Sequence, residues 1–369
     1  MRIAFYAPLK SPDDPTPSGD RRMARLLMRA LREAGHDVAL ASDFRSYDGR
    51  GDDSRQAALQ AEAGAIAETL LAGWRQNGAA IAPELWFTYH LYHKAPDWLG
   101  PAVCAELAIP YVVAEASHAP KQSGGAWDRG YRAAAAAIAS AAVVYAMTRL
   151  DSACLEPLVQ PPHRLCYLPP FIDAMPVSAA ESADIEHRFG IDMTRHRLLT
   201  VAMMRPGDKL ASYRELAQAL ALLEGDDWQL TIVGDGPCRP EVERLFATFG
   251  DRVRLIGALA EEALNAVYAA ADLYLWPGVG EAYGMAFLEA QAQATPVVAT
   301  TRRGIPDVVR ADAGGLLVPP ADPAAFAAAI RRLLDDAPLR RRMAGAAQVF
   351  VTRERSLAAT AAQLRASLP

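Results

Sequence analysis

The stretch GEAYGMAFLEA, residues 280–290, carries two glutamates, Glu281 and Glu289. It follows an apolar run that ends in Trp276-Pro277, and the residues from Gly284 to Ala292 are typical of a helix. The first-turn amides and the dipole of a helix favour an anion, and a carboxylate accepts two hydrogen bonds from vicinal hydroxyls. We therefore expect a sugar at one glutamate, a ribose at the other and a diphosphate at the helix start. Dipole complementation would also explain Glu281, but a solvated face fits Glu289 poorly, since apolar residues crowd that helix.

Two other loops carry candidate residues for binding a diphosphate. Arg205 and Lys209 bracket a Pro-Gly turn after an apolar run. The planar guanidinium of arginine can donate two parallel hydrogen bonds and the ammonium of lysine is a compact charge, so the pair suits a diphosphate. Surface cations that only aid solubility are an equally good explanation. The turn VGDGP contains Gly234, where glycine permits either close approach to a ligand or an ordinary tight turn. Arg239 occupies the third glycine position of G-x-G-x-x-G, which disfavours a dinucleotide-dependent dehydrogenase.

Short apolar runs alternate with longer amphipathic ones along the whole chain. Such alternation predicts parallel sheets covered by helices. A proline-rich passage, residues 161–176, separates two such series. The predicted strands are 3–7, 37–41, 85–89, 111–114, 143–146 and 165–168 before that passage, and 198–202, 229–233, 253–256, 273–276, 297–299 and 316–318 after it.

The predicted fold class is therefore α/β, with two doubly wound, Rossmann-like domains and a cleft between them. Ligands of open parallel sheets bind beyond the carboxyl ends of the strands, so the loops that follow the strands should form the site. We place an N-terminal domain at 1–172 and a C-terminal domain, which contains the candidate sugar and diphosphate residues, at 173–350. A C-terminal helix at 351–369 could pack back on the N-terminal domain.

With these residues in place, the stretch GEAYGMAFLEAQAQATPVVA resembles the signature of family 4 glycosyltransferases, in which seven residues separate two glutamates. The Arg205/Lys209 loop, VGDGP, AADLYLWP and PVVA occur in the family's order, and the resemblance covers most of the chain. It implies the GT-B fold, nucleotide-activated sugar donors, retention of anomeric configuration and no metal for chemistry. Consistent with the last point, the sequence contains no D-x-D motif.

The resemblance also implies roles for individual residues. Arg205 and Lys209 should bind the donor diphosphate, and Glu289 should bind the ribose hydroxyls. Glu281 should hold the transferred sugar and the distal phosphate together with the amides of Tyr283, Gly284, Met285 and Ala286. His118, in EASH after a predicted strand, matches a histidine that the family often places near the donor sugar. Without the resemblance, a structural histidine would be the better interpretation of His118.

The sequence departs from the family pattern at three positions. Asp20 follows Gly19 where two glycines are usual, which puts the role of Gly19 in doubt. Ala294 stands where a glycine usually ends the signature helix. Arg303 precedes Gly304 where the family often has two glycines. We expect these last two to alter loop geometry only. The rings of residues 89–93, after another predicted strand, could stack on a sugar acceptor or equally pack against a neighbouring loop.

Composition sets wider bounds. A chain of 369 residues that is 51% hydrophobic can build two cores, and a net charge of -5 gives no reason to expect nucleic acid as a partner. The four cysteines are unpaired in sequence, so we interpret them as buried hydrophobes of a reduced cytoplasmic protein.

No apolar run reaches the roughly 18 residues of a membrane span. A basic stripe, Arg22, Arg25, Arg29 and Arg32, is best explained as a solvated face, although it could contact the inner face of a membrane.

The resulting hypothesis is a retaining, metal-independent glycosyltransferase of the hexosyltransferase class that takes part in glycan biosynthesis. Its partners would be a nucleoside-diphosphate sugar and a hydroxyl acceptor, which could be a glycan, a glycolipid or a small molecule. No cofactor is expected. The alternatives are a non-catalytic sugar-nucleotide-binding protein, or an epimerase or phosphorylase of the same double-Rossmann plan. Release of nucleoside diphosphate from the donor would distinguish an enzyme from a binding protein.

Overall fold

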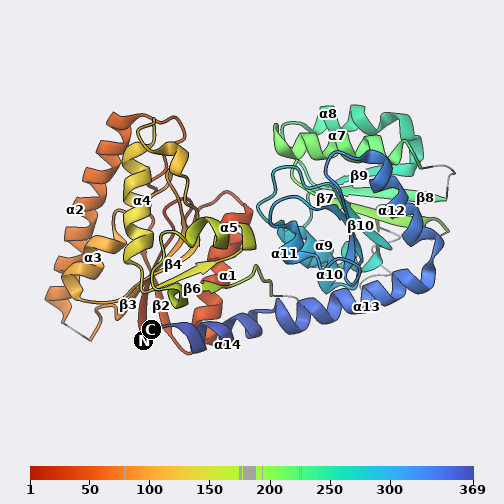
Figure 1. The fold of residues 1–369 in the computed structure, drawn as a ribbon. Coiled ribbons are helices and arrows are strands. Elements are labelled where there is room, and N and C mark those ends of the chain that lie inside the picture. The colour runs from red at the N-terminus through yellow and green to blue at the C-terminus, as the bar shows by residue number, and fades with distance from the viewer. Residues whose placement is uncertain (79, 174–176, 178–187, 193, 224, 226) are drawn as a thin grey trace. The chain divides into compact units, whose positions relative to one another are not determined.

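The computed structural model of the chain describes residues 1–78, 80–173, 177, 188–192, 194–223, 225 and 227–369 (Figure 1). The chain divides into two compact units. Unit 1 comprises Met1–Pro169 together with Leu357–Pro369, and unit 2 comprises Pro170–Ser356. Pro176, at the end of the proline-rich passage, lies outside the described residues.

Unit 1 is built on a parallel sheet of six strands in the order β2-β1-β3-β4-β5-β6. Most of its strands are short apolar runs buried on both faces, as a parallel sheet between helices requires. The order reverses at β1, because β2 pairs with one edge of β1 and β3 with the other. The strands are β1 (Arg2–Tyr6), β2 (Asp37–Ser42), β3 (Leu85–Leu91), β4 (Tyr111–Ala116), β5 (Val143–Ala146) and β6 (Leu165–Tyr167).

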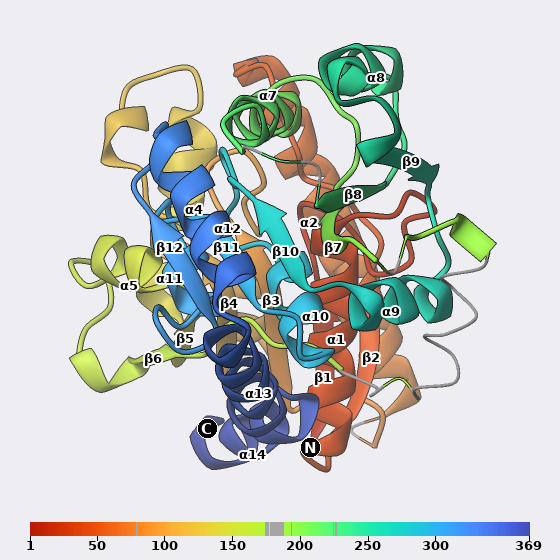
Figure 2. The same ribbon diagram turned by 90° about the vertical axis from the view of Figure 1, so that its right-hand side faces the viewer.

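Helices cover both faces of this sheet (Figures 1 and 2). Side chains of α2 to α5 share one core with the sheet, and α1 and α14 pack together on the other face. Ser18 caps α1, and Arg365 of α14 donates hydrogen bonds to the carbonyl oxygens of Glu33 and Ala34 at the end of α1. The helices are α1 (Gly19–Glu33), α2 (Asp53–Asn77), α3 (Gly100–Leu107), η1 (Pro120–Gln122), α4 (Asp128–Ser140), α5 (Arg149–Leu155), η2 (Pro162–Arg164) and α14 (Leu357–Ser367).

Unit 2 repeats the plan with a parallel sheet in the order β12-β11-β10-β7-β8-β9. Here the order reverses at β7, which pairs with β8 on one edge and β10 on the other. A crevice that binds ligands is expected beyond the carboxyl ends of strands at such a reversal. The strands are β7 (His196–Val201), β8 (Trp228–Val233), β9 (Val253–Gly257), β10 (Leu273–Trp276), β11 (Val297–Thr300) and β12 (Gly315–Val318).

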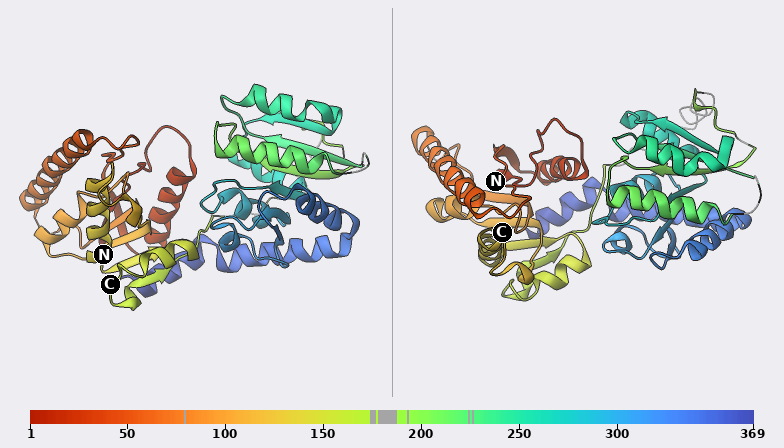
Figure 3. Two further views of the ribbon diagram at one scale, coloured as in Figure 1. Left: turned by 45° about the horizontal axis from the view of Figure 1, so that its top comes forward. Right: turned by 90° about the horizontal axis from the view of Figure 1, so that it is seen from above.

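The helices of unit 2 again lie on both faces of the sheet (Figure 3). On one face α7 packs against α8 and α12, and on the other α10 packs against α9 and α13. The helices are α7 (Asp208–Leu220), α8 (Arg239–Phe246), η3 (Ala247–Arg252), α9 (Glu261–Ala270), α10 (Met285–Ala292), α11 (Ile305–Val308), α12 (Pro323–Asp335) and α13 (Ala337–Glu354).

All twelve strands predicted from the sequence are present, most with ends shifted by one or two residues. The interpretation of the cysteines needs a correction, because only Cys104 is buried and Cys154, Cys166 and Cys238 are half-buried. Across the described residues, the helices include none with the length and apolarity needed to cross a bilayer.

Candidate active site

The sequence-predicted donor residues of unit 2 lie on the loops after β7, β8 and β10. These loops leave neighbouring strands on either side of the reversal at β7. Arg205 and Lys209 belong to the first loop and the helix that follows it, Gly234 to the second, and Glu281 to the third. The order of the strands is therefore what collects residues that are far apart in the sequence.

Two glycines bring the β8 loop against the β7 loop. Gly234 has φ 143° and Gly236 has φ 151°, and a Cβ on them would overlap the carbonyl oxygens of Ala202 and Met204, respectively. Two hydrogen bonds of 2.9 Å hold the loops together, from Met204 N–H to Asp235 O and from Cys238 N–H to Met204 O. Glycine is thus required at both positions for packing of the site. Sequence reasoning selected Gly234 and missed Gly236, although both stand in VGDGP.

Lys209, in the first turn of α7, forms an ion pair with Glu281 on the β10 loop. The indole N–H of Trp276 donates to the same carboxylate oxygen of Glu281, Oε1, at 2.9 Å. The Lys209 ammonium also lies 5.7 Å from the centre of the Trp276 ring, within reach of a cation–π interaction. No hydrogen bond of Glu281 Oε2 is found within the described part of the chain. Sequence reasoning gave Lys209 and Glu281 separate roles and gave Trp276 none.

The β10 loop that carries Glu281 is fixed from several sides. Gly278, Gly280 and Gly284 all have positive φ, from 65° to 82°, which only glycine adopts without strain. The hydroxyl of Ser212 on α7 accepts a hydrogen bond of 2.9 Å from Val279 N–H. On the other side, Gly304 N–H donates to Ala282 O at 2.9 Å. Glu281 is consequently held by the backbone of its loop as well as by its ion pair.

Two helices begin at this site without a side-chain cap. Gly207 precedes α7 and Gly284 precedes α10, whereas Asp322 and Asp336 cap α12 and α13 through their side chains. The first amides of an uncapped helix are available to an anion, and the dipole favours one there. Met285 and Ala286, in the first turn of α10, are half-buried, and Tyr283 is buried. The start of α10 can therefore bind a phosphate through the backbone.

Glu289 is the fifth residue of α10 and is only 8% exposed. The hydroxyl of Tyr268 on α9 donates a hydrogen bond of 2.9 Å to Glu289 Oε2. Glu289 thus lies about one turn into the helix. No local sequence pattern indicates a role for Tyr268, because α9 and α10 become neighbours only when the chain folds.

Arg205 is exposed, and its guanidinium makes no hydrogen bond or ion pair with any residue that the structure describes. Its position on the β7 loop leaves the charge available to a ligand. Arg302, on the β11 loop, is engaged instead: it pairs with Glu215 at 2.7 and 2.9 Å. The two arginines near this edge of the sheet therefore differ in role, since one supports the fold and the other is open to solvent.

His118 and Gly19 belong to unit 1. His118 lies two residues beyond β4, where its ring centre is 5.4 Å from that of Tyr131 and burial lowers its pKa. Gly19 is the first residue of α1, and a Cβ on it would meet no atom within 4 Å. Nothing in unit 1 requires glycine at position 19.

The ring-rich loop after β3 packs on itself. Ring centres lie 5.4 Å apart for His90 and Tyr92, 5.3 Å for Tyr92 and His93, and 5.9 Å for His93 and Trp127. This series favours packing against a neighbouring loop over stacking on an acceptor. Burial raises the pKa of Tyr92 well above its usual value, which keeps its hydroxyl neutral.

The two departures from the family pattern in unit 2 keep a backbone conformation that glycine favours. Ala294, just past α10, has φ 59°, and Arg303 has φ 42°. The N–H of Thr295 bonds to Ala290 O and that of Ala294 to Gln291 O, which is the usual hydrogen bonding of a helix that ends in a left-handed residue. The backbone is left-handed at both positions, and a non-glycine residue bears the strain. The expected change in loop geometry stays a prediction.

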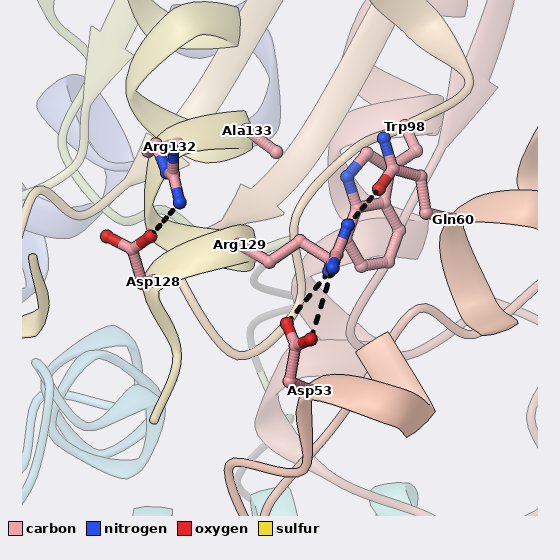
Figure 4. Close-up of a pocket in the computed structure, with 7 residues that line it drawn as sticks. All are labelled: Asp53, Gln60, Trp98, Asp128, Arg129, Arg132 and Ala133. Carbon is pink, nitrogen blue, oxygen red and sulfur yellow. Dashed lines mark hydrogen bonds and ion pairs between the residues drawn. The ribbon is translucent and has the colours of Figure 1, made fainter. Parts of the chain in front are cut away.

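A pocket with a volume of about 380 Å³ lies on unit 1, and none of the predicted site residues lines it (Figure 4). Its charged residues neutralise one another: Arg129 bonds to Asp53 at 3.0 and 3.2 Å, and Arg132 pairs with Asp128. Within the described ranges, no group of three or more His, Cys, Asp or Glu side chains could hold a metal ion. Independence of metal stays a prediction.

Comparison with known proteins agrees with this geometry. Residues 195–336, which contain the whole donor cluster, match the family described as "Glycosyl transferases group 1". Alpha-D-kanosaminyltransferase of Streptomyces kanamyceticus is 34% identical over 206 residues, 55% of this chain and 52% of that protein. D-inositol 3-phosphate glycosyltransferase of Salinispora tropica is 40% identical over 146 residues, 37% of this chain and 29% of that protein. The chain thus matches about half or less of the length of these relatives.

Solved structures match over nearly the whole chain. Sucrose-phosphate synthase of Thermosynechococcus elongatus has a TM-score of 0.73 at 22% identity and covers 99% of this chain and 97% of its own. HepE of Anabaena in complex with UDP has a TM-score of 0.75 at 16% identity and covers 100% and 99%, respectively. At such identities the likeness concerns the fold alone. The chain therefore has the GT-B fold of these structures, and its residues 195–336 are similar to glycosyl transferases group 1.

Proposed function

We propose that the protein transfers a sugar from a nucleoside diphosphate to a hydroxyl acceptor, with retention of anomeric configuration. The observation that carries this proposal is the contact of Lys209 and Trp276 with Glu281 beside the uncapped start of α10. It puts three kinds of group close together: a cation, a set of backbone amides, and a carboxylate in which one oxygen has no partner among the described residues. Those are the groups that a sugar diphosphate requires.

The diphosphate would be bound by Arg205, Lys209 and the first amides of α10. As the bond between sugar and phosphate breaks, negative charge accumulates on the departing nucleoside diphosphate. Cations and amides that are already oriented toward this charge stabilise it more than groups that must first reorient. Lys209 is oriented by Glu281 and Trp276 before any donor binds, and its ammonium has three N–H groups, so it can contact a phosphate without releasing the carboxylate.

Glu281 would bind the transferred sugar through Oε2, because Oε1 already accepts from Lys209 and Trp276. Its negative charge would also stabilise the positive charge that develops on the sugar ring. Glu289 would bind ribose hydroxyls, with its carboxylate oriented by the hydrogen bond from Tyr268. His118 is proposed to contact the donor sugar from unit 1, and no metal is required because the protein supplies the cations.

A ligand panel tests the donor site first. UDP, GDP, ADP and their glucose conjugates are each added to the intact chain, and the melting temperature is recorded. A ligand at ~100 times its Kd adds about 2.7 kcal/mol of stability, which raises the melting temperature. The relatives in complex with UDP make UDP the first candidate. No response to any of these nucleotides would contradict the proposal.

Transfer is then tested with the donor that binds. Glucose, myo-inositol, D-inositol 3-phosphate and 2-deoxystreptamine serve as acceptors, the last two because relatives are named for them. Release of nucleoside diphosphate is measured with and without excess EDTA. Release that depends on an acceptor and survives EDTA supports a metal-independent transferase. Binding of nucleotide without release from any donor would favour a sugar-nucleotide-binding protein.

Contact with a lipid acceptor or with the inner face of a membrane has weaker support. Arg25 and Arg32 of the basic stripe on α1 already donate hydrogen bonds to the carbonyl oxygens of Pro12 and Val38. These bonds turn two of the four guanidinium groups of the stripe toward the backbone of unit 1. A cytoplasmic location stays a prediction.

A further inference from the structure

His90 and Glu115 share an unusual backbone conformation at neighbouring positions of the unit 1 sheet. Their φ angles are 63° and 56°, in the left-handed region that residues other than glycine seldom adopt. Strands β3 and β4 pair at Tyr89↔Ala114 and again at Leu91↔Ala116, so His90 and Glu115 lie side by side between those pairs. Such strain is typical of functional sites, and this one lies at the carboxyl ends of the strands, where parallel sheets bind ligands.

The side chains at this point form a mixed cluster of charges. His90 Nδ1 lies 3.1 Å from Asp20 Oδ1 and 3.9 Å from Glu115 Oε1. Asp20 is the second residue of α1, so it enters the cluster from the loop after β1. Because β1 and β3 are adjacent on either side of the reversal in strand order, the cluster lies where the ligand crevice of unit 1 is expected.

The charges around His90 favour its imidazolium form. Burial opposes protonation, but Glu115 on β4, Asp20 on α1 and Asp151 on α5 outweigh it and raise the pKa of His90 to about 8. Burial in turn raises the pKa of Glu115, and Lys10 helps to keep Asp20 ionised. At neutral pH both ring nitrogens of His90 therefore carry a proton.

Only one of those two protons has a partner. Nδ1 faces the carboxylates, and Nε2 makes no hydrogen bond with the residues for which the structure gives positions. The side chain is 23% exposed, and the rings of Tyr89 and Tyr92, centred 5.8 and 5.4 Å away, flank it. His90 is thus a fixed hydrogen-bond donor at the ligand edge of unit 1.

We propose that His90 contacts the acceptor: Nε2–H donates a hydrogen bond to an acceptor hydroxyl, while Asp20 and Glu115 are positioning residues that hold the ring. The assignment rests on the proposed function, which supplies the hydroxyl acceptor. It predicts that acceptor binding weakens when the ring is removed or turned. Binding of the bare nucleoside diphosphate should be unchanged, because the residues proposed to bind the diphosphate and the ribose belong to unit 2.

The test uses the whole chain and three variants. His90→Gly removes the ring and suits the left-handed backbone, so the fold should persist. His90→Asn also tolerates that conformation and retains an N–H donor, so it should restore part of the function. Asp20→Asn keeps its size but loses the charge that holds the imidazolium. For each variant, KM and kcat are measured with whichever of glucose, myo-inositol, D-inositol 3-phosphate and 2-deoxystreptamine the wild type glycosylates, and nucleotide affinity is measured separately.

We expect His90→Gly to raise the KM for the acceptor by about tenfold, which corresponds to the loss of one charge-assisted hydrogen bond. The affinity for nucleotide should be unchanged. The wild-type acceptor KM should rise as pH increases through about 8, and in Asp20→Asn that rise should move to lower pH. An acceptor KM in His90→Gly within about threefold of wild type would overturn the assignment, since a contact this small is not a charge-assisted bond. Failure of the wild type to bind nucleotide or to transfer would instead remove the proposed function, and this assignment with it.

Discussion

Lys209 and Glu281, 72 residues apart in the chain, form an ion pair between the first turn of α7 and the loop that follows β10. The pair shares Glu281 Oε1 with the indole N–H of Trp276 and leaves Oε2 without a partner in the described part of the chain. The donor site is thus partly assembled before a donor binds. A site oriented in advance loses less free energy to reorganisation when charge develops on the leaving group.

Replacing either cation should weaken nucleotide binding. Each of Arg205→Ala and Lys209→Ala removes a charge-assisted hydrogen bond, worth roughly 1.5–3 kcal/mol of binding free energy. Titration calorimetry with the nucleoside diphosphate chosen by the panel measures the loss. Arg303→Ala is a suitable control, because Arg303 is also an exposed arginine of unit 2 but lies on the β11 loop. Wild-type affinity in both cation variants would show that the cluster does not bind the diphosphate.

The glycines of the site should differ from Gly19 in their tolerance of alanine. A Cβ on Gly234 would overlap the carbonyl oxygen of Ala202, and its φ of 143° is unfavourable for alanine. We therefore expect Gly234→Ala to destabilise the protein by about 1–3 kcal/mol, as strained backbone positions do. Gly19→Ala, with no atom within 4 Å of the new methyl group, should change stability by less than about 0.5 kcal/mol. Thermal melting of the two variants decides this, and equal melting temperatures would contradict it.

Ala294→Gly should stabilise unit 2. Ala294 holds the left-handed position at the end of α10, where glycine avoids the clash of Cβ with the following carbonyl group. Relief of that strain exceeds the entropy that glycine loses on folding, and we expect a gain of about 0.5–1 kcal/mol. Ala221→Gly is the matched control, since Ala221 ends α7 with φ −65° and should lose stability instead. A loss of stability in Ala294→Gly as well would show that the alanine methyl group contributes through packing.

The sequence was sufficient to predict both sheets, because buried parallel strands are short apolar runs that Gly, Pro and polar residues separate. It was also sufficient to place Glu281 and Lys209 on loops after strands. It could not show that they touch, since that depends on strand order, which brings β7 and β10 together across 72 residues. For the same reason the contact of Tyr268 with Glu289, between α9 and α10, had no local signal.

Backbone conformation was the other feature that the sequence did not reveal. Alanine, arginine, histidine and glutamate give no sign of positive φ, so the left-handed residues Ala294, Arg303, His90 and Glu115 could not be recognised. The cluster at His90 was missed because Asp20 was considered only as a departure from a pair of glycines. Its contact with His90 joins the start of α1 to the end of β3.

Stability should fall with rising pH near neutrality because of His90. Its pKa in the folded chain is about 8, above the ordinary value of 6.5. A raised pKa gives a stabilisation that is complete below pH 6.5 and is lost as pH rises through about 8. A pKa difference of this size corresponds to ~2 kcal/mol. The difference in melting temperature between wild type and His90→Asn, measured from pH 6 to about pH 9, should shrink across that window. A difference independent of pH would mean that the charges around His90 do not favour its imidazolium.

The two glutamates of the signature stretch should lose different functions. Glu281→Gln keeps the size of the side chain and one acceptor but loses the charge that can stabilise a developing positive sugar. We expect it to bind the bare nucleoside diphosphate almost normally while single-turnover transfer falls by about 100-fold or more, as when a preoriented charge is removed from a transition state. Glu289→Gln should weaken bare nucleotide and sugar nucleotide alike, because the ribose is common to both.

Tyr268→Phe separates the two roles of Glu289. It removes the hydroxyl that bonds Glu289 Oε2 but leaves the carboxylate in place. If Glu289 acts on the ribose, its orientation matters, and Tyr268→Phe should weaken nucleotide binding in the same direction as Glu289→Gln, with a smaller effect. If Glu289 serves only to satisfy a buried tyrosine, both variants should lower the melting temperature and leave nucleotide affinity unchanged. Full transfer activity in Glu281→Gln would show that the carboxylate beside Lys209 and Trp276 is not required for the reaction. The assignment of Glu281 Oε2 to the sugar would then be wrong.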